Sequence, residues 1–467
     1  MSLSQIPEKW DGEADVIVVG AGTAGLPAAI AAQDEGAKVL VLEVWSGPAS
    51  SLAYIAGGTP FMGTDVQKAA GVDDSAEKCF AEAMKVSGGD PKLYEVLAKR
   101  QMDTYEWLKA QGAKVIGVFE APGHSLPRIH RWEGHGAGLL KVLRNKVEEK
   151  GIEIRFKHRA DRLVQDPATG RIIGVRARHE DKDLYFRARK GVILANGGFI
   201  RNKEMIAEYG PYYIECVPVT PPTHMGDGLR MVLDVGGATY GIGIAVCPSI
   251  SACTETGHTT IIPNHGAISV NVHGERWCDE MCTDWGTYSP MFRDIVRQDP
   301  HGGLHFNIYD SLIREETSPE AYRQIKEYQA DTLEELAKTV GVNAEGLAKT
   351  IEEYNNDIEK YGYDRKYNRR AWGGLHGNEP PPKIEKPPFY AMKCKVSLSS
   401  LKGGVKINTR AQVVDNFDAP IPGLYAAGEV AGGFCNKPDA YYAGIMTLQS
   451  FVLGRVAAEN AAAETAA

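Results

Sequence analysis

Apolar and polar residues follow a strand, turn, helix and strand order at the start of the chain. Residues 15–19 form a run of β-branched side chains, which is typical of a buried strand. Glycines follow, an alanine-rich stretch to about residue 35 predicts a helix, and residues 38–43 predict a second strand. Such a βαβ unit has parallel strands and a right-handed crossover. The pattern therefore predicts a doubly wound, Rossmann-like α/β domain.

The pattern changes twice further along the chain. Residues 75–112 have helical spacing. Residues 152–156, 171–179 and 191–195 have strand patterns. Two polar amphipathic helices are then predicted at about 318–340 and 344–360. Strand character returns after a proline-rich stretch at 379–383, and a last helix begins near residue 446. We therefore expect one domain from residues 1–244 and 391–467, interrupted by an inserted α+β capping domain at 245–390.

Composition narrows the classes of function. The 467-residue chain is 43% hydrophobic and 24% charged, and no apolar run reaches the roughly 18 residues that cross a bilayer. Its net charge of -8 comes from intermixed acids and bases, so we expect neither a membrane span nor a nucleic-acid partner. The first residues lack the features of a secretory signal, which predicts a cytoplasmic location. The eight cysteines are scattered, so we expect reduced thiols and no metal site.

The glycine turn has the chemistry of a diphosphate site. Gly20, Gly22 and Gly25 bring free backbone amides and the positive end of a helix dipole close to an anion. Glu43 ends the second predicted strand and is placed to accept hydrogen bonds from ribose hydroxyls. These residues predict a dinucleotide cofactor, but the turn alone does not distinguish NAD from FAD.

Two later segments resemble a known family. Residues 195–199 (Ala-Asn-Gly-Gly-Phe) and 421–429 (Ile-Pro-Gly-Leu-Tyr-Ala-Ala-Gly-Glu) look like marks of the fumarate reductase and ketosteroid dehydrogenase flavoproteins. The resemblance also covers residues 14–20, 57–61, 67–75, 226–229 and 387–391 with the glycines at 403 and 404. It implies that the cofactor is one FAD and that the chain is an FAD-dependent oxidoreductase.

The resemblance also implies which residues hold the cofactor. In this family the late Gly-Glu pair lies beside the ribityl and phosphate groups of FAD, and the following helix points its N-terminus at the flavin ring. A helix N-terminus there would stabilise the negative charge of a reduced flavin. With the turn and the acid, the implied contacts are Gly20, Gly22, Thr23, Ala24, Gly25, Glu43, Ser50, Ser51, Gly57, Gly58, Asn196, Gly197, Gly198, Gly428, Glu429, Gly444, Met446 and Thr447.

The family adds or removes hydrogen across a carbon-carbon bond next to a carbonyl, exchanging a hydride at flavin N5 and a proton with the protein. Its fumarate branch binds dicarboxylates through a histidine and an arginine near the late glycines and a catalytic arginine in the inserted domain. Here Ser399 or Ser400, Tyr441 and Asp284 stand at those positions. Two buried carboxylates without arginines are disfavoured. Reduction of an unsaturated acid is therefore the alternative prediction.

The ketosteroid branch resembles this chain more closely at one motif. It carries a tyrosine shortly before the glycine that starts the flavin-facing helix, and residues 441–444 (Tyr-Tyr-Ala-Gly) match it, although Ala443 replaces a usual serine. A tyrosine hydroxyl and the Gly444 amide would stabilise an enolate. Either Tyr441 or Tyr442 is expected to pack instead, because neighbours in an extended segment point apart.

The main prediction is thus oxidation or reduction of the bond α,β to a ketone in an apolar, cyclic substrate such as a 3-ketosteroid. For proton transfer the sequence favours Tyr288, with Thr283 and Asp284 as rivals. A flavin-binding protein without catalysis is a third hypothesis, against which the inserted domain argues. An electron donor or acceptor is required, but no motif identifies it.

Overall fold

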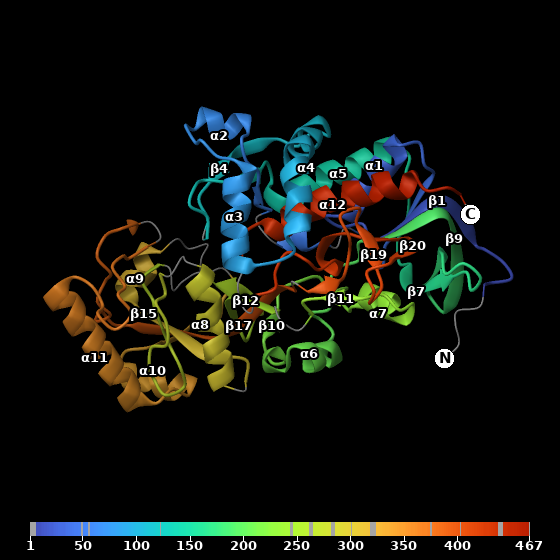
Figure 1. Ribbon diagram of the computed structural model, residues 1–467. Coiled ribbons are helices and arrows are strands. Elements are labelled where there is room, and N and C mark those ends of the chain that lie inside the picture. The colour runs from blue at the N-terminus through green and yellow to red at the C-terminus, as the bar shows by residue number, and fades with distance from the viewer. Residues whose placement is uncertain are drawn as a thin grey trace. The chain divides into compact units, whose positions relative to one another are not determined.

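The protein is described by a computed structural model (Figure 1). The description covers residues 6–47, 50–54, 57–121, 123–242, 246–260, 265–281, 285–299, 301–317, 324–373, 376–401, 403–437 and 442–466. The chain divides into two compact units. The first consists of Met1–Gly210, Thr220–Cys247 and Ser400–Ala467, and the second of Pro211–Val219 and Pro248–Ser399.

A largely parallel sheet forms the centre of the first unit. Its strand order is β19, β20, β9, β1, β2, β6, and the five strands from β20 to β6 run parallel. These strands are β19 (Gln412–Val414), β20 (Pro420–Ala426), β9 (Lys182–Leu194), β1 (Gly12–Val19), β2 (Val39–Leu42) and β6 (Glu153–Arg155). Neighbouring strands that run parallel but are not consecutive in the sequence are typical of a doubly wound sheet. The predicted α/β fold is therefore confirmed.

The remaining strands of the sheet pair as an antiparallel extension. In it β7 (Arg159–Gln165) pairs with β8 (Ile172–His179), which pairs with the first half of β9. Two smaller sheets complete the unit: β3 (Thr59–Pro60), β5 (Ile129–Trp132) and β4 (Val115–Phe119), and the pair β11 (Thr239–Tyr240) and β18 (Gly404–Val405).

Two helices lie side by side against the main sheet. Helix α1 (Gly25–Asp34) follows β1, and α12 (Ile445–Ala462) packs along it (Figure 1). Most residues of both helices are buried, which explains why their apolar residues show little amphipathic periodicity. The other helices of the unit are α2 (Asp65–Ala69), α3 (Ala76–Ser87), α4 (Pro91–Ala110), α5 (His135–Glu149), α6 (Lys203–Tyr209) and α7 (Asp227–Asp234).

Among its described residues, the second unit contains a seven-stranded, mostly antiparallel sheet and four α-helices. The strands are β10 (Val217–Pro218), β12 (Val246–Cys253), β13 (Thr259–Thr260), β14 (Ile268–Val270), β15 (His305–Asp310), β16 (Tyr328–Ala330) and β17 (Phe389–Leu401). The helices are α8 (Trp285–Gln298), α9 (Ser311–Glu316), α10 (Leu333–Val340) and α11 (Ala344–Tyr361). Apolar side chains from β14, β15, β17, α10 and α11 form its core.

The limits of this unit differ from residues 245–390 because of one long strand. β17 continues beyond residue 390, and β10 pairs with it in parallel through Val217 and Ser397. This pairing brings residues 211–219 into the second unit. The predicted helix at 318–340 is wrong in its first part: β16 occupies residues 328–330, and α10 begins only after Thr332, whose hydroxyl caps Glu335 N. None of the described helices is long and apolar enough to span a bilayer.

Candidate functional site

Four loops of the first unit meet at one edge of its parallel sheet. Because β1, β2, β9 and β20 run in the same direction, the residues that follow them lie at the same edge. Those residues are Gly20, Glu43, Asn196 and Gly428. In open α/β sheets the crevice at the carboxyl ends of the strands is where ligands bind.

The glycine turn is tightly closed against its neighbours. Gly20 has φ +103°, and a Cβ there would lie 2.6 Å from the Ala195 carbonyl oxygen. A Cβ on Gly25 would overlap the Gly20 carbonyl oxygen. Helix α1 starts after Ala24 without any side-chain cap, so the positive end of its dipole is left for another partner. The turn therefore fits a diphosphate held by backbone amides.

Glu43 closes the turn from the side of β2. Its Oε2 accepts a hydrogen bond from Ala21 N at 2.7 Å, and its Oε1 accepts one from Trp45 N at 2.9 Å. Burial raises the pKa of this carboxyl, and the backbone hydrogen bonds from Ala21 and Trp45 act against that rise. A carboxylate has about four acceptor positions, so these two bonds leave capacity for ribose hydroxyls.

Two hydroxyls and two glycines continue the site. Ser50 Oγ lies 3.0 Å from Thr23 Oγ1 and accepts a hydrogen bond from Leu52 N. Ser51 follows at the start of a short 3-10 helix, η1 (Ser51–Tyr54). A Cβ on Gly57 would lie 2.6 Å from Gly136 Cα, and one on Gly58 would overlap the Ile129 side chain. These glycines let the segment lie close against α5 and β5.

The late segments approach the same turn. Gly428, at the start of the 3-10 helix η6 (Gly428–Val430), has φ +82°, and a Cβ there would lie 3.0 Å from Ala24 Cβ. Gly454 of α12 also lies against Ala24, because a Cβ on Gly454 would lie 2.5 Å from Ala24 O. Asn196 Oδ1 is buried and has no hydrogen-bond partner among the described residues. A buried acceptor of this kind fits a donor supplied by a ligand.

Helix α12 begins at this edge without a side-chain cap. Its N-cap is Gly444 with φ +75°, where a Cβ would lie 2.7 Å from Pro60 Cδ and 2.9 Å from Gly58 O. Met446 and the buried Thr447 form its first turn. Two uncapped helix starts, an acid and an unpartnered amide oxygen fit the phosphates and polar groups of a dinucleotide such as FAD. The described residues of the predicted set thus lie on segments that fit FAD.

Known proteins match the chain over nearly its whole length. The FAD binding domain family matches residues 15–437. A probable fumarate reductase, Ifc3, of Shewanella frigidimarina is 32% identical and covers 96% of this chain and 74% of its own. The chain belongs to the fumarate reductase and succinate dehydrogenase flavoprotein superfamily. This flavoprotein binds FAD and is an oxidoreductase that acts on CH-CH bonds.

Other relatives show the range of the superfamily. A urocanate reductase of Eggerthella lenta is 31% identical over 99% of this chain and 77% of its own. The open conformation of a flavocytochrome c3 fumarate reductase has a TM-score of 0.84 at 30% identity, over 97% of this flavoprotein and 78% of that chain. The 3-ketosteroid Δ4-(5α)-dehydrogenase of Rhodococcus jostii RHA1 has a TM-score of 0.76 at 26% identity, over 99% of both.

The hydroxyl of Tyr442 is engaged within the first unit of the flavoprotein. The side chain is fully buried; its hydroxyl donates to Glu82 Oε2 at 3.2 Å and accepts from Arg128 Nη1 at 3.1 Å. Burial raises its pKa further from neutrality. Its ring lies 4.0 Å from that of His124, whose Nε2 donates to Ala443 O at 3.0 Å. These contacts anchor the residues just before α12 and are those of a packing side chain.

The other predicted catalytic side chains have no described contacts. Tyr441, Thr283 and Asp284 lie outside the described residues, and Tyr288 lies in α8 with its side chain outside the description. Their roles stay predictions.

Arg128 is a buried residue that the sequence did not single out as an anchor. It pairs with Asp74 at 2.7 Å and with Glu82, and neither its own side chain nor that of Asp74 is exposed. Burial raises the Glu82 pKa, but hydrogen bonds from Arg128 and Ser125 outweigh it and lower that pKa to about 2. Arg128 is thus neutralised within the fold. The sequence shows an arginine and a histidine at positions 128 and 130, but it does not show which acidic residues pair with Arg128.

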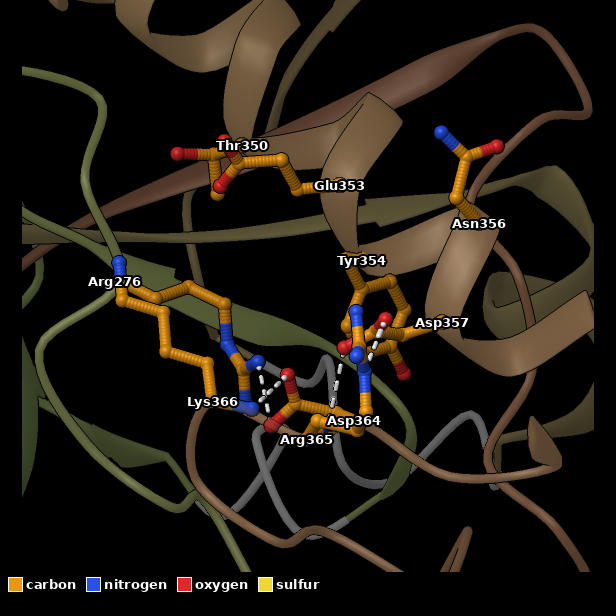
Figure 2. Close-up of a pocket in the computed structure, with 9 residues that line it drawn as sticks. All are labelled: Arg276, Thr350, Glu353, Tyr354, Asn356, Asp357, Asp364, Arg365 and Lys366. Atoms are coloured by element: carbon orange, nitrogen blue, oxygen red, sulfur yellow. Dashed lines mark hydrogen bonds and ion pairs between the residues drawn. The ribbon is translucent and has the colours of Figure 1, made fainter. Parts of the chain in front are cut away.

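The second unit has an open pocket of about 520 Å³ (Figure 2). Its lining residues are Arg276, Thr350, Glu353, Tyr354, Asn356, Asp357, Asp364, Arg365 and Lys366. Arg276 pairs with Glu280 at 2.6 Å and Asp364 at 2.9 Å, and Arg365 pairs with Asp357 at 2.8 Å. The arginines at this pocket are therefore committed to carboxylates of their own unit.

Proposed function

We propose that this flavoprotein reduces the carbon-carbon double bond of an α,β-unsaturated carboxylic acid, with a monocarboxylate preferred over a dicarboxylate. The observation that carries the proposal is similarity along nearly the whole chain, at 31–32% identity, to proteins named as reductases of fumarate and urocanate. An NADH:acrylate oxidoreductase of Vibrio harveyi is 33% identical over 80% of this chain and 37% of its own. The sheet edge that fits FAD supports the same chemistry.

The residues of the chain contribute binding and electrostatics to this reaction. When bound, FAD supplies the hydride that reduction of a double bond needs. The starts of α1 and α12 would supply dipoles that stabilise negative charge on the cofactor, and Glu43 would hold its ribose. The cluster of Arg128, Glu82 and Tyr442 holds the residue before α12 in place. A proton donor is needed at the second carbon, for which Tyr288, Thr283 and Asp284 remain the candidates.

The preference for a monocarboxylate follows from the arginines. Ser399 or Ser400, Tyr441 and Asp284 stand where a dicarboxylate site of this superfamily carries histidine and arginines. Arg128 and Arg276 cannot substitute for them, because each already pairs with two carboxylates. A second buried carboxylate on the substrate would therefore be left without a partner, at a large desolvation cost.

A second candidate is reduction or formation of an enone in a cyclic ketone. It is favoured by the same missing arginines and by the similarity to the Rhodococcus jostii dehydrogenase over 99% of both chains. An uncharged ketone would need only hydrogen-bond donors at its oxygen.

The two candidates differ in which compound accepts electrons from the enzyme. The purified holoenzyme is reduced with dithionite under argon, and reoxidation is followed by flavin absorbance after adding urocanate, acrylate, fumarate or 4-androstene-3,17-dione. We expect an unsaturated monocarboxylate to reoxidise the flavin fastest and fumarate to act more slowly. Reoxidation by the enone alone would replace the first candidate with the second. Failure of every acceptor would contradict both.

A further inference from the structure

His224 lies between two residues of the predicted FAD site. It belongs to the loop before α7, and 7% of its side chain is exposed. Its Nδ1 is 3.3 Å from Glu429 Oε2, and its Nε2 is 3.4 Å from Ser51 Oγ. The three side chains come from distant parts of the sequence, so only the folded first unit brings them together.

The imidazole also packs on the glycine loop that follows β9. A Cβ on Gly197, which has φ +76°, would lie 2.8 Å from His224 Nε2. The backbone of His224 is fixed as well: its N-H donates to Pro221 O, and its carbonyl accepts from Arg201 N at 3.0 Å. Three segments that are predicted to touch FAD, at Ser51, Gly197 and Glu429, thus converge on one buried ring whose place is set by the main chain.

We propose that His224 is a positioning residue for FAD, which holds the Glu429 carboxylate and the Ser51 hydroxyl ready for the ribityl-diphosphate part of the cofactor. A neutral imidazole has one donor and one acceptor. His224 Nε2 is hydrogen-bonded to the Ser51 hydroxyl, and Nδ1 lies 3.3 Å from Glu429 Oε2 without a hydrogen-bond partner among the described residues. Fixing polar groups before the ligand arrives reduces the entropy lost on binding.

The order hydroxyl, imidazole, carboxylate also occurs in hydrolases, where it activates a nucleophile. The location of these groups favours cofactor binding instead. Ser51 follows the loop in which Ser50 contacts Thr23 of the phosphate turn, and Glu429 follows Gly428, which packs on Ala24 of the same turn.

The test is FAD binding to the apoprotein, without any substrate. Apoprotein of His224→Ala, His224→Gln and the wild type is titrated with FAD while the quenching of flavin fluorescence is recorded. We expect the dissociation constant to rise at least about tenfold in His224→Ala, because the part-buried Glu429 carboxylate and Ser51 hydroxyl lose the ring that lies between them. His224→Gln keeps a donor and should lie between. The control is His301→Ala, an exposed histidine of the second unit, which should bind FAD normally.

Two further measurements separate positioning from a merely structural role. The thermal midpoint of the apoprotein should change little in His224→Ala, whereas the stabilisation by added FAD should shrink. Glu429→Gln combined with His224→Ala should weaken binding less than the sum of the single effects, because the two residues act together. Unchanged FAD affinity, or equal destabilisation of apoprotein and holoprotein, would overturn the proposal. Because no substrate is present, neither result depends on which double bond the enzyme reduces.

Discussion

At the scale of single residues, the first unit holds charges that are buried only because they are paired. Arg128 bonds to Asp74 and Glu82, and the same Glu82 oxygen accepts from Tyr442. Removing one partner of such a group leaves an uncompensated charge, which costs more than the pair itself contributes. The cluster therefore ties the residue before β5, helix α3 and the segment before α12 together.

The pH dependence of stability should reveal Glu82. Its pKa is lowered from 4.5 to about 2 in the folded protein. A carboxyl with a lowered folded pKa contributes stability above its unfolded pKa and loses it as the pH falls toward its folded pKa. We expect the thermal midpoint to fall between pH 4.5 and about 2, and Glu82→Gln to remove part of that fall. The measurement is thermal unfolding as a function of pH.

A matched variant is Glu133→Gln, because Glu133 pairs with Lys114 at 3.5 Å and 65% of its side chain is exposed. It should leave the acid branch of the profile unchanged. If Glu82→Gln and Glu133→Gln gave the same profile, the buried pairing would not contribute as described.

Residue-level prediction from sequence was possible where the signal was local. Gly20, Gly25 and Glu43 were predicted as cofactor contacts from spacing alone, and the structure places them at one turn of a βαβ unit. His224 and Arg128 were not, because each acquires its role from side chains far away in the chain. No periodicity encodes such contacts.

At the scale of elements, the start of α12 depends on a glycine for two reasons. Gly444 has φ +75°, and a Cβ there would also collide with Pro60 and Gly58. We expect Gly444→Ala to displace the first turn of α12, to weaken FAD binding and to lower the flavin midpoint potential, because the helix dipole would no longer point at the reduced ring. Potentiometric titration of the holoenzyme measures this.

Gly362 allows the effect of the left-handed φ to be measured without the steric collision. It caps α11 with the same φ of +75°, and nothing lies within 4 Å of a Cβ there. Gly362→Ala should cost about 1 kcal/mol of left-handed strain and leave the flavin untouched. A normal midpoint potential in Gly444→Ala would contradict the role given to α12.

Element prediction succeeded for β1, α1 and β2, which form one βαβ unit, and for α11, whose amphipathic pattern is long. It failed in the first part of the helix predicted at 318–340: residues 318–323 lie outside the description, and β16 occupies residues 328–330. That strand is three residues long and pairs with β17 through Tyr328 and Ala391, so its partner rather than its own sequence determines it.

At the scale of the whole molecule, the cofactor site is assembled from both ends of the chain. Its loops follow β1, β2, β9 and β20 and include the start of α12. A ligand that binds only the folded state stabilises it, by about 2.7 kcal/mol at a hundredfold excess over its dissociation constant. We therefore expect the thermal midpoint to rise with FAD concentration, as measured by differential scanning fluorimetry.

Riboflavin is the matched control ligand for this experiment. It carries the same ring but lacks the diphosphate and the adenosine, so it cannot engage the glycine turn or Glu43. If riboflavin raised the thermal midpoint as much as FAD does, the glycine turn and Glu43 would contribute nothing to cofactor binding.

The close contact between Gly454 and the Ala24 carbonyl also sets a length. Because Gly454 has no side chain, the middle of α12 lies directly against the start of α1, and the first turns of α12 extend from that contact. A cofactor that engaged both helix starts would have to span the distance that this contact leaves between them. The absence of a side chain at position 454 thus helps to determine how long a cofactor must be to contact both helix starts.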